Sequence, residues 1–296
     1  MTGYFPIADG PYRLAMGLQK LKLEDWIEID AALADDLREK QRLLAERHAE
    51  VFQALPGSEP GQAEVLDMLA DHLPEHHPLT YRRDGQRLLV KPLDSWFDLS
   101  DRTAPPLETA SRLVQEDLCL MEPDGDAYSL TAASVCFPTR WNLLSKIGRP
   151  LAEIHAPVPG YTEKLERPMD RFFSLLNEAK PVQRLNWSLM DDPTLFQPKG
   201  HGRTERDDSI TADNAGERLW LRVERQTLRR LPQTGGILFT IRIHTNPLSE
   251  IAAESGRAAR LLTALRTMPD GMRGYKSMPV FGAAVERYLE NRSGLG

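Results

Sequence analysis

The spacing of hydrophobic residues divides the first part of the chain into an arm and two helices. Residues 1–30 are predicted to form an extended arm with short amphipathic pieces. In residues 31–55 apolar side chains recur at helical intervals among Glu, Lys and Arg, and residues 62–73 repeat the pattern after a PGSEPG break. One apolar stripe per helix is typical of a surface helix that packs on a core.

The hydrophobic period then changes from that of a helix to that of a strand. Residues 79–94 alternate around Asp84 and Gly85, a pair that favours a hairpin turn. Further strands are predicted at residues 114–121, 128–136, 182–189, 218–228 and 237–244. Helices are predicted at residues 107–113, 141–147, 162–177 (with Thr162 as N-cap), 246–268 and 279–291.

A polar loop separates two of the predicted strands, at residues 190–216. A loop of this length in a compact domain is usually functional or mobile. Because it contains few hydrophobic residues to hold one conformation, we expect it to be poorly ordered or to cover the mouth of a pocket.

The order of elements predicts an α+β fold. Two strands, several helices and three more strands form the order of a PAS domain, a sheet with one helical excursion on one face. PAS domains hold haem, flavin or a small ligand between sheet and excursion. We therefore expect a PAS-like antiparallel sheet in residues 106–296 with packing helices at the C-terminus, and a helical extension with a hairpin in residues 1–105. The two parts are expected to form one compact unit.

Composition excludes several classes of function. The net charge of −6 and a pI near 5.7 argue against a general nucleic-acid surface, which needs a basic stripe. No apolar run approaches a membrane span, and the N-terminus lacks a secretory pattern. Two cysteines are too few for a disulfide framework. We therefore expect a cytoplasmic protein without membrane or nucleic-acid partners.

His155 is the leading candidate for a ligand to a cofactor. It lies in the segment IHAPVPG, where each proline favours extended backbone in the residue before it. This places His155 at the end of a helical run, in a stiff apolar wall. A neutral imidazole presented in this way suits a haem iron or a soft metal. A buried histidine that bonds a backbone carbonyl is the alternative.

The predicted strand around LRVERQTLRR carries more charge than a half-buried strand needs. Alternation places Trp220, Arg222, Glu224 and Gln226 on one face, and Leu219, Leu221, Val223 and Arg225 on the other. If the first face is buried, its charges need partners. If it faces solvent, the charges are surface residues of little energetic weight. Arg184 and Asn186 on the preceding predicted strand raise the same question.

Several blocks of sequence resemble a known enzyme family. The blocks CFPTRW, IGRPLAEIHAPVPGY, RFF, VQRLNWSL, LRVERQTLRRLP and LFTIRI are similar to the oxygenase (alpha) subunit of haem-dependent oxidative N-demethylase, also called dimethylamine monooxygenase. The resemblance runs from about Tyr12 to the last helix. It implies a haem-binding PAS fold that oxidises a small secondary amine with O2 and reductase-supplied electrons, giving the demethylated amine and formaldehyde.

The resemblance also suggests roles for individual residues. His155 is expected to ligate the iron of haem b, with Cys136 as the competing ligand. His201 and His244 are expected to be structural or exposed, with a place near the cofactor as the alternative. Arg140, Lys146 and Arg149 are candidates for the haem propionates, and Trp141 for lining the cofactor. Glu224 is expected to hold the cationic amine, and Arg222 to supply a hydrogen-bond donor for O2.

The electrons are expected to come from another protein. The chain has no flavin or pyridine-nucleotide motif, and its two cysteines are too few for an all-cysteine iron–sulfur cluster. NADPH and a separate flavin and iron–sulfur reductase are therefore the expected source. Two alternatives remain: a haem PAS sensor of gas or ligand without catalysis, and a binding module that has lost its cofactor. No kinase, cyclase or DNA-binding output module is visible in this sequence, which favours the enzyme over the sensor.

Overall fold

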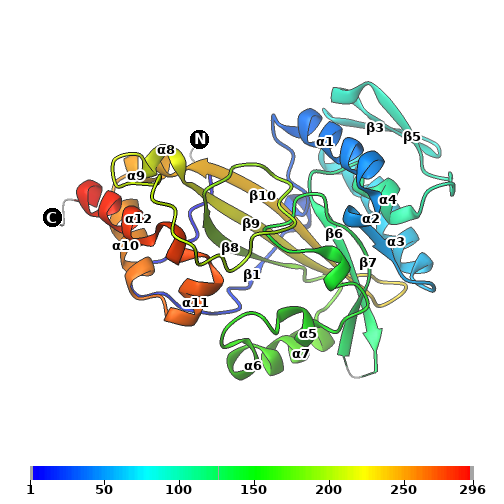
Figure 1. The fold of residues 1–296 in the computed structure, drawn as a ribbon. Helices are drawn as coiled ribbons and strands as arrows, with labels where there is room; N and C mark the ends of the chain where they lie inside the picture. The colour runs from blue at the N-terminus through cyan, green and yellow to red at the C-terminus, as the bar shows by residue number, and fades with distance from the viewer. Residues whose placement is uncertain (1–2, 126, 294–296) are drawn as a thin grey trace.

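A seven-stranded antiparallel sheet forms the centre of the molecule. The computed structural model describes residues 3–125 and 127–293. The strands lie in the order β1-β8-β9-β10-β6-β7-β2, and each neighbouring pair is antiparallel (Figure 1). Their bounds are β1 Gln19–Lys20, β2 Phe52–Ala54, β6 Asp117–Asp124, β7 Ala127–Ser134, β8 Val182–Met190, β9 Trp220–Arg230 and β10 Ile237–Pro247. The five long strands predicted from the alternation are confirmed, with small shifts at their ends.

The chain makes one helical excursion between β7 and β8. Its elements are η3 Leu143–Ser145, α5 Leu151–His155, α6 Tyr161–Lys164 and α7 Glu166–Leu175. The prediction of one helix over residues 162–177 is wrong, because the helix is interrupted at Leu165 and Thr162 lies inside α6 instead of capping it. Pro168 explains the break: it has no N–H to bond the carbonyl of Lys164, and its ring clashes with that carbonyl.

The N-terminal part forms a helical layer at one end of the sheet. Its elements are η1 Leu23–Asp25, α1 Leu33–Glu46, α2 His48–Val51, α3 Glu59–His76, η2 Lys91–Leu93 and α4 Pro106–Ser111, with a small sheet of β3 Tyr81–Asp84, β4 Arg87–Val90 and β5 Ser95–Asp98. The hairpin predicted at Asp84 and Gly85 is confirmed, and Gly85 has the positive φ that its turn requires. The helix predicted to reach residue 55 ends at Val51, because Phe52 pairs with Ser134 of β7.

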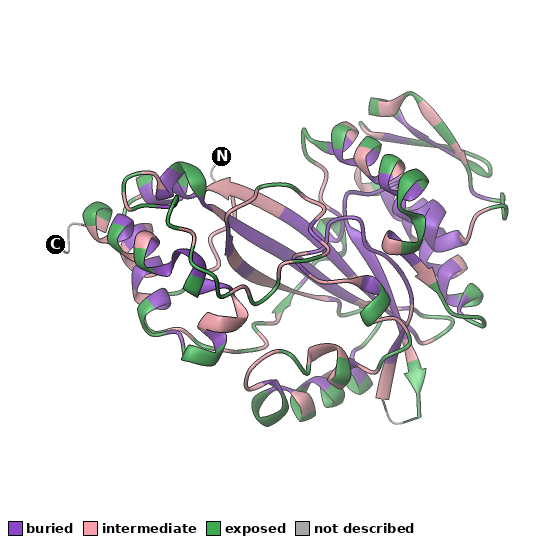
Figure 2. Ribbon diagram, viewed as in Figure 1, coloured by how far each residue is buried: buried purple, intermediate pink, exposed green. Residues whose placement is uncertain are grey.

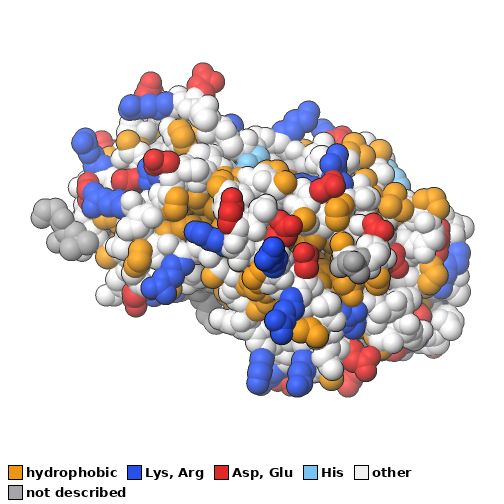
Figure 3. All heavy atoms as spheres, turned by 90° about the horizontal axis from the view of Figure 1, so that it is seen from below, with side chains coloured by type: hydrophobic (Ala, Val, Ile, Leu, Met, Phe, Trp, Pro, Cys, Tyr) orange, Lys and Arg blue, Asp and Glu red, His pale blue; other side chains and the backbone are white. Residues whose placement is uncertain are grey.

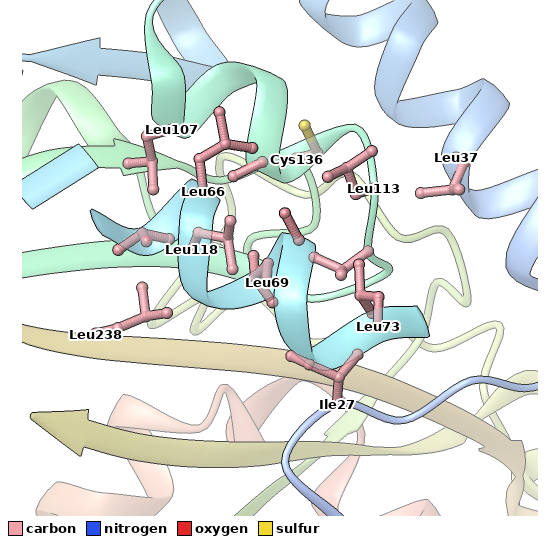
Figure 4. Close-up of a cluster of buried hydrophobic side chains, with 14 of the residues drawn as sticks. Ile27, Leu37, Leu66, Leu69, Leu73, Leu107, Leu113, Leu118, Cys136 and Leu238 are labelled. Carbon is pink, nitrogen blue, oxygen red and sulfur yellow. The ribbon is translucent and has the colours of Figure 1, made fainter. Parts of the chain in front are cut away.

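The N-terminal segment is joined to the sheet at both edges. β1 pairs with β8, and β2 pairs with β7. Leucines of α1 and α3 share one hydrophobic cluster with Leu118 of β6 and Leu238 of β10 (Figure 4). The arm is fastened by Arg225, whose guanidinium donates to the carbonyl oxygens of Asp25 and Trp26.

The C-terminal helices pack against the other end of the sheet. They are α8 Ala215–Arg218, α9 Leu248–Ala253, α10 Arg257–Arg266, α11 Asp270–Tyr275 and α12 Met278–Ser293. They share a cluster with Leu221 and Val223, the residues that alternate with Glu224 along β9. The predicted helix over residues 246–268 is two helices, because Gly256 takes a left-handed conformation (φ 75°) between them.

Layers on both faces bury most of the central strands, as Figure 2 shows. Residues 221–228 of β9 are all buried. In a strand that is buried on both faces, any charged side chain needs hydrogen-bond partners or an opposite charge, since an isolated buried charge is very costly. In the described residues, no helix is both long and apolar enough to cross a membrane.

His72 of α3 should make the fold sensitive to acid. Its side chain is 5% exposed, stacks edge-on against Trp26 at 5.0 Å, and has no hydrogen-bond partner at Nε2 among the described residues. Burial lowers the pKa of His72 to about 3. Between the unfolded value of about 6.5 and this value, the unfolded chain binds a proton that the folded chain does not.

We therefore expect the free energy of unfolding to fall as the pH falls from about 6.5 towards 3, by up to about 1.4 kcal/mol per pH unit from this residue. His72→Phe, which does not titrate, should have a flatter profile than the wild type in urea unfolding between pH 7.5 and 4.5. A His72→Phe profile parallel to the wild-type profile would contradict this prediction.

Candidate functional site

The helical excursion covers one face of the sheet. Leu151 and Tyr161 of the excursion share a hydrophobic cluster with Leu228 of β9 and with Val182, which pairs with Leu228 across the sheet. Because side chains alternate along each strand, the same face carries a row of polar residues. We call these the sheet-face cluster: Arg184 and Asn186 on β8, and Arg222, Glu224 and Gln226 on β9.

His155 is the last residue of α5. Its Nδ1 lies 2.9 Å from the carbonyl oxygen of Leu151, one helical turn earlier. This bond makes Nδ1 the donor and leaves the lone pair on Nε2 free of any described partner. Metal-bound histidines commonly donate their other ring N–H to a carbonyl in the same way. His155 can therefore bond a backbone carbonyl through Nδ1 and still offer Nε2 to a metal ion, so the two interpretations of this histidine do not exclude each other.

The surroundings of His155 favour the neutral ring. Burial lowers its pKa, and the positive charges of Lys146 and Arg184 lower it further, against the opposing effect of the Leu151 carbonyl. The ring stacks on Tyr161 with 4.8 Å between centroids and 12° between planes. A neutral imidazole with a fixed orientation and a free Nε2 is the form that binds a metal ion.

Glu224 is a buried carboxylate without a cationic partner. It is 7% exposed, and its Oε2 accepts hydrogen bonds from Asn186 Nδ2 at 3.2 Å and Gln226 Nε2 at 2.6 Å. Among the described residues, no basic nitrogen lies within 4.0 Å of it. The interpretation of this strand face as solvent-exposed is wrong, since Arg222 and Glu224 are both buried. Two amide donors hold the carboxylate in place, and its charge remains available to a cationic ligand.

Arg222 joins three segments of the chain. Its Nε donates to Thr139 Oγ1 at 3.0 Å, Nη1 to the Thr194 carbonyl at 2.9 Å, and Nη2 to the carbonyls of Phe137 and Leu195, each at 2.9 Å. Burial lowers the pKa of Arg222 to about 10. These bonds use most of its N–H groups. Arg222 thus fastens the start of the excursion and the long loop to β9, and this geometry does not support its expected role as a donor to O2.

The expected propionate-binding cations also have partners within the chain. Arg140 is buried and bonds Asp191 and Gln197, the latter at 3.1 Å. Arg149 is exposed and pairs with Glu153 at 3.2 Å. Lys146 donates to the carbonyl of Ile154. Trp141 is half-buried and packs against two of the hydrophobic clusters, including the one under the excursion.

The cysteines and His244 lie in other surroundings. Cys136 packs among the leucines of the N-terminal layer (Figure 4), and burial raises the pKa of its thiol to about 12. Burial also raises the pKa of Cys119. A thiol whose pKa is raised in this way is mainly protonated and is a poor ligand. His244 bonds Glu28 Oε2 at 3.0 Å and packs edge-on against Tyr4, so it anchors the N-terminal arm.

The long loop is anchored at several points. Asp191 bonds both Arg140 and Arg203, Gln197 is buried, and Ile210 belongs to the C-terminal hydrophobic cluster. The Asp207 N–H donates to the Val280 carbonyl at 3.0 Å. These contacts favour an ordered loop, the second of the two expected alternatives, over a poorly ordered one. Through its bonds to Arg222, the loop lies over the face that carries Glu224, in keeping with a covering role.

Lys276 was missed in the sequence. It follows α11, and its Nζ donates to the Trp187 carbonyl. Burial lowers its pKa to about 8, while the charge of Glu224 opposes that shift. The centroid of the neighbouring Tyr275 ring lies 4.0 Å from that of the His201 ring, so α11 and the loop are in contact. The charge of Glu224 acts on Tyr275, so this contact lies beside the sheet-face cluster. No spacing or motif marks Lys276, because its position depends on how α11 packs against β8.

A comparison with protein families identifies the family of the chain. Residues 17–286 match the family described as haem-dependent oxidative N-demethylase, alpha subunit-like. The chain belongs to this family. Membership indicates a haem-dependent enzyme subunit of the oxidative N-demethylase type, and the alpha-subunit designation implies an enzyme of several subunits.

The residues present fit the haem that this N-demethylase family requires. His155 offers a free Nε2 from a neutral, oriented ring. An apolar cluster that includes Leu151, Met169 and Phe173 adjoins it, as a hydrophobic macrocycle needs. The Tyr161 hydroxyl and Arg184 Nε are buried and have no hydrogen-bond partner among the described residues. Buried polar atoms without partners mark places where a ligand can supply them. Figure 3 shows the underside of the molecule, where hydrophobic and basic side chains are interspersed.

Proposed function

We propose that this chain is the haem-binding catalytic subunit of an amine monooxygenase that demethylates a small secondary amine such as dimethylamine. The observation that carries the proposal is the buried Glu224 carboxylate, held by two amides and paired with no described cation. A protonated secondary amine can pair directly with this carboxylate, because it carries a positive charge and two N–H donors. A neutral ligand would lack the charge that makes this hydrogen bond a charge-assisted one.

Each residue has a defined part in this proposal. His155 holds the iron of haem b through Nε2, and the Leu151 carbonyl fixes the ring orientation. When bound, haem supplies the activation of O2. Glu224 binds the amine nitrogen, and Asn186 and Gln226 keep the carboxylate in position. The reaction consumes the secondary amine, O2, two electrons and two protons, and gives the primary amine, formaldehyde and water.

The fold supports a PAS-like assignment for residues 106–296. The five long strands lie in the order β7-β6-β10-β9-β8, and the excursion that carries His155 leaves the sheet between β7 and β8. Residues 1–105 are the extension that adds β1, β2 and the helical layer. We further propose that electrons come from NADPH through a separate flavin and iron–sulfur reductase subunit, since both cysteines of this chain are buried and free.

The test is a reconstitution of the chain with haem and a reductase fraction. We expect a Soret band, and release of formaldehyde that requires both NADPH and dimethylamine. A Soret band without turnover in the complete system would favour a haem sensor instead. No Soret band would point to a binding module without cofactor. Omitting the amine is the control for formaldehyde from other sources.

A further inference from the structure

Arg184 is a cation without a partner in the sheet-face cluster. Its Nε is fully enclosed and bonds to nothing, and no carboxylate oxygen lies within 4.0 Å of its guanidinium among the described residues. Burial also lowers the pKa of Arg184. Arginine in such a setting normally forms bidentate pairs with an anion, because a desolvated guanidinium without acceptors is costly.

The charges around Arg184 call for an anion. Arg222, further along the same face, is buried and donates mainly to backbone carbonyls, although the carboxylates of Asp117 and Asp192 also act on it. Lys276 is half-buried near Glu224 and donates to the Trp187 carbonyl. Glu224 is the acid of the cluster. The cluster is therefore net positive before any ligand binds. A cationic amine at Glu224 makes this imbalance larger, so the required anion is not the substrate.

Arg184 lies near both proposed binding residues, Glu224 for the amine and His155 for the haem iron. Arg184 pairs with Gln226 across the sheet, and Asn186, two residues along the same face, pairs with Glu224. Arg184 and Glu224 are thus diagonal neighbours, about 7–8 Å apart at the backbone. The charge of Arg184 also acts on His155 and Tyr161. One guanidinium therefore lies between the His155 wall and the Glu224 carboxylate.

We propose that Arg184 binds a propionate carboxylate of the haem held by His155, an inference that rests on the proposed function. Its planar fork matches a carboxylate bidentately, and the buried setting strengthens each charge-assisted hydrogen bond. The pair also neutralises a charge that would repel the amine. Arg140 and Arg149 are already paired with Asp191 and Glu153. In the described part of the chain, Arg184 is a guanidinium with free donors that acts on His155.

The experiment compares two porphyrins on the apoprotein. Haem carries two carboxylates, and haem dimethyl ester carries none, so their affinity ratio measures recognition of the carboxylates. The wild type should bind haem about ten- to a hundredfold more tightly than the ester, the range expected for a charge-assisted hydrogen bond. In Arg184→Gln the affinity for haem should fall by that factor, with little change for the ester. Arg149→Gln, at an exposed position, should keep the wild-type ratio.

The ratio of the affinities for haem and its dimethyl ester distinguishes failure of the proposed function from failure of this inference. A wild type that binds neither porphyrin overturns both the proposed function and this inference. A wild type that binds both equally, or an Arg184→Gln variant that keeps the wild-type ratio, overturns the inference alone. If Arg184→Gln does not fold, Arg184→Lys retains the charge without the bidentate fork and should show an intermediate ratio. An unchanged ratio in Arg184→Lys would then refute the role of the fork.

Discussion

His155→Gly purified from haem-supplemented cells should contain almost no haem. The side chain supplies the only iron ligand that the site geometry supports among the described residues, with Nδ1 committed to Leu151 and Nε2 free. Removing an outer partner of a metal ligand already weakens binding by about ten- to a hundredfold, so loss of the ligand itself should exceed a hundredfold. Haem titration followed at the Soret band measures this directly.

Rescue with free imidazole makes the prediction specific. The space left by the His155 side chain should admit imidazole, which can ligate the iron in its place and restore much of the Soret band. His48→Gly, at an exposed position, is the control and should keep wild-type haem content. Full haem content in His155→Gly without imidazole would remove His155 from the ligand role. The next candidate ligand would then be His201, whose ring packs on Tyr275 beside the sheet-face cluster.

The sequence predicted the sheet well because its signals are local. Alternation over eight to eleven residues marks β6 to β10. It also places the neighbouring residues Val223 and Glu224 of β9 on opposite faces of the sheet. Which face would be buried was undecidable from one strand, since Arg222 and Glu224 suit either a surface or a polar site. The excursion and the long loop decide it, and both come from elsewhere in the chain.

The roles of the cations could not be predicted for a related reason. Nothing in the sequence around Arg140, Arg184 and Arg222 indicates which partners each of them meets. Arg140 meets Asp191, Arg222 meets backbone carbonyls from two segments, and Arg184 meets no acceptor among the described residues. These partners are tens of residues away in the chain, and guanidinium groups at the end of flexible side chains have no periodicity to reveal them. Only the tertiary structure distinguishes an arginine whose donors are used within the fold from one whose donors are free to bind a ligand.

Glu224→Gln should weaken amine binding by about ten- to a hundredfold while haem content stays near the wild-type level. The substitution keeps the size of the side chain and removes the negative charge, so a charge-assisted hydrogen bond to the protonated amine becomes a neutral one. The amide oxygen of the substituted side chain can still accept from Asn186 or Gln226, which should preserve the local fold. Haem content should not change, because Glu224 is not proposed to contact the iron.

The measurement is an amine titration followed by the Soret shift, with wild type and variant side by side. Glu217→Gln is the matched control, because Glu217 is exposed on α8 and the same charge is removed there. A non-ionic ether of similar size provides a second comparison: it lacks the charge, so Glu224→Gln should bind it no more weakly than the wild type does. Equal amine affinity in wild type and Glu224→Gln would place Glu224 outside the substrate site. The carboxylate would then be balanced within the protein, and Arg184, Arg222 and Lys276, on which the charge of Glu224 acts, are the candidates in the described part of the chain.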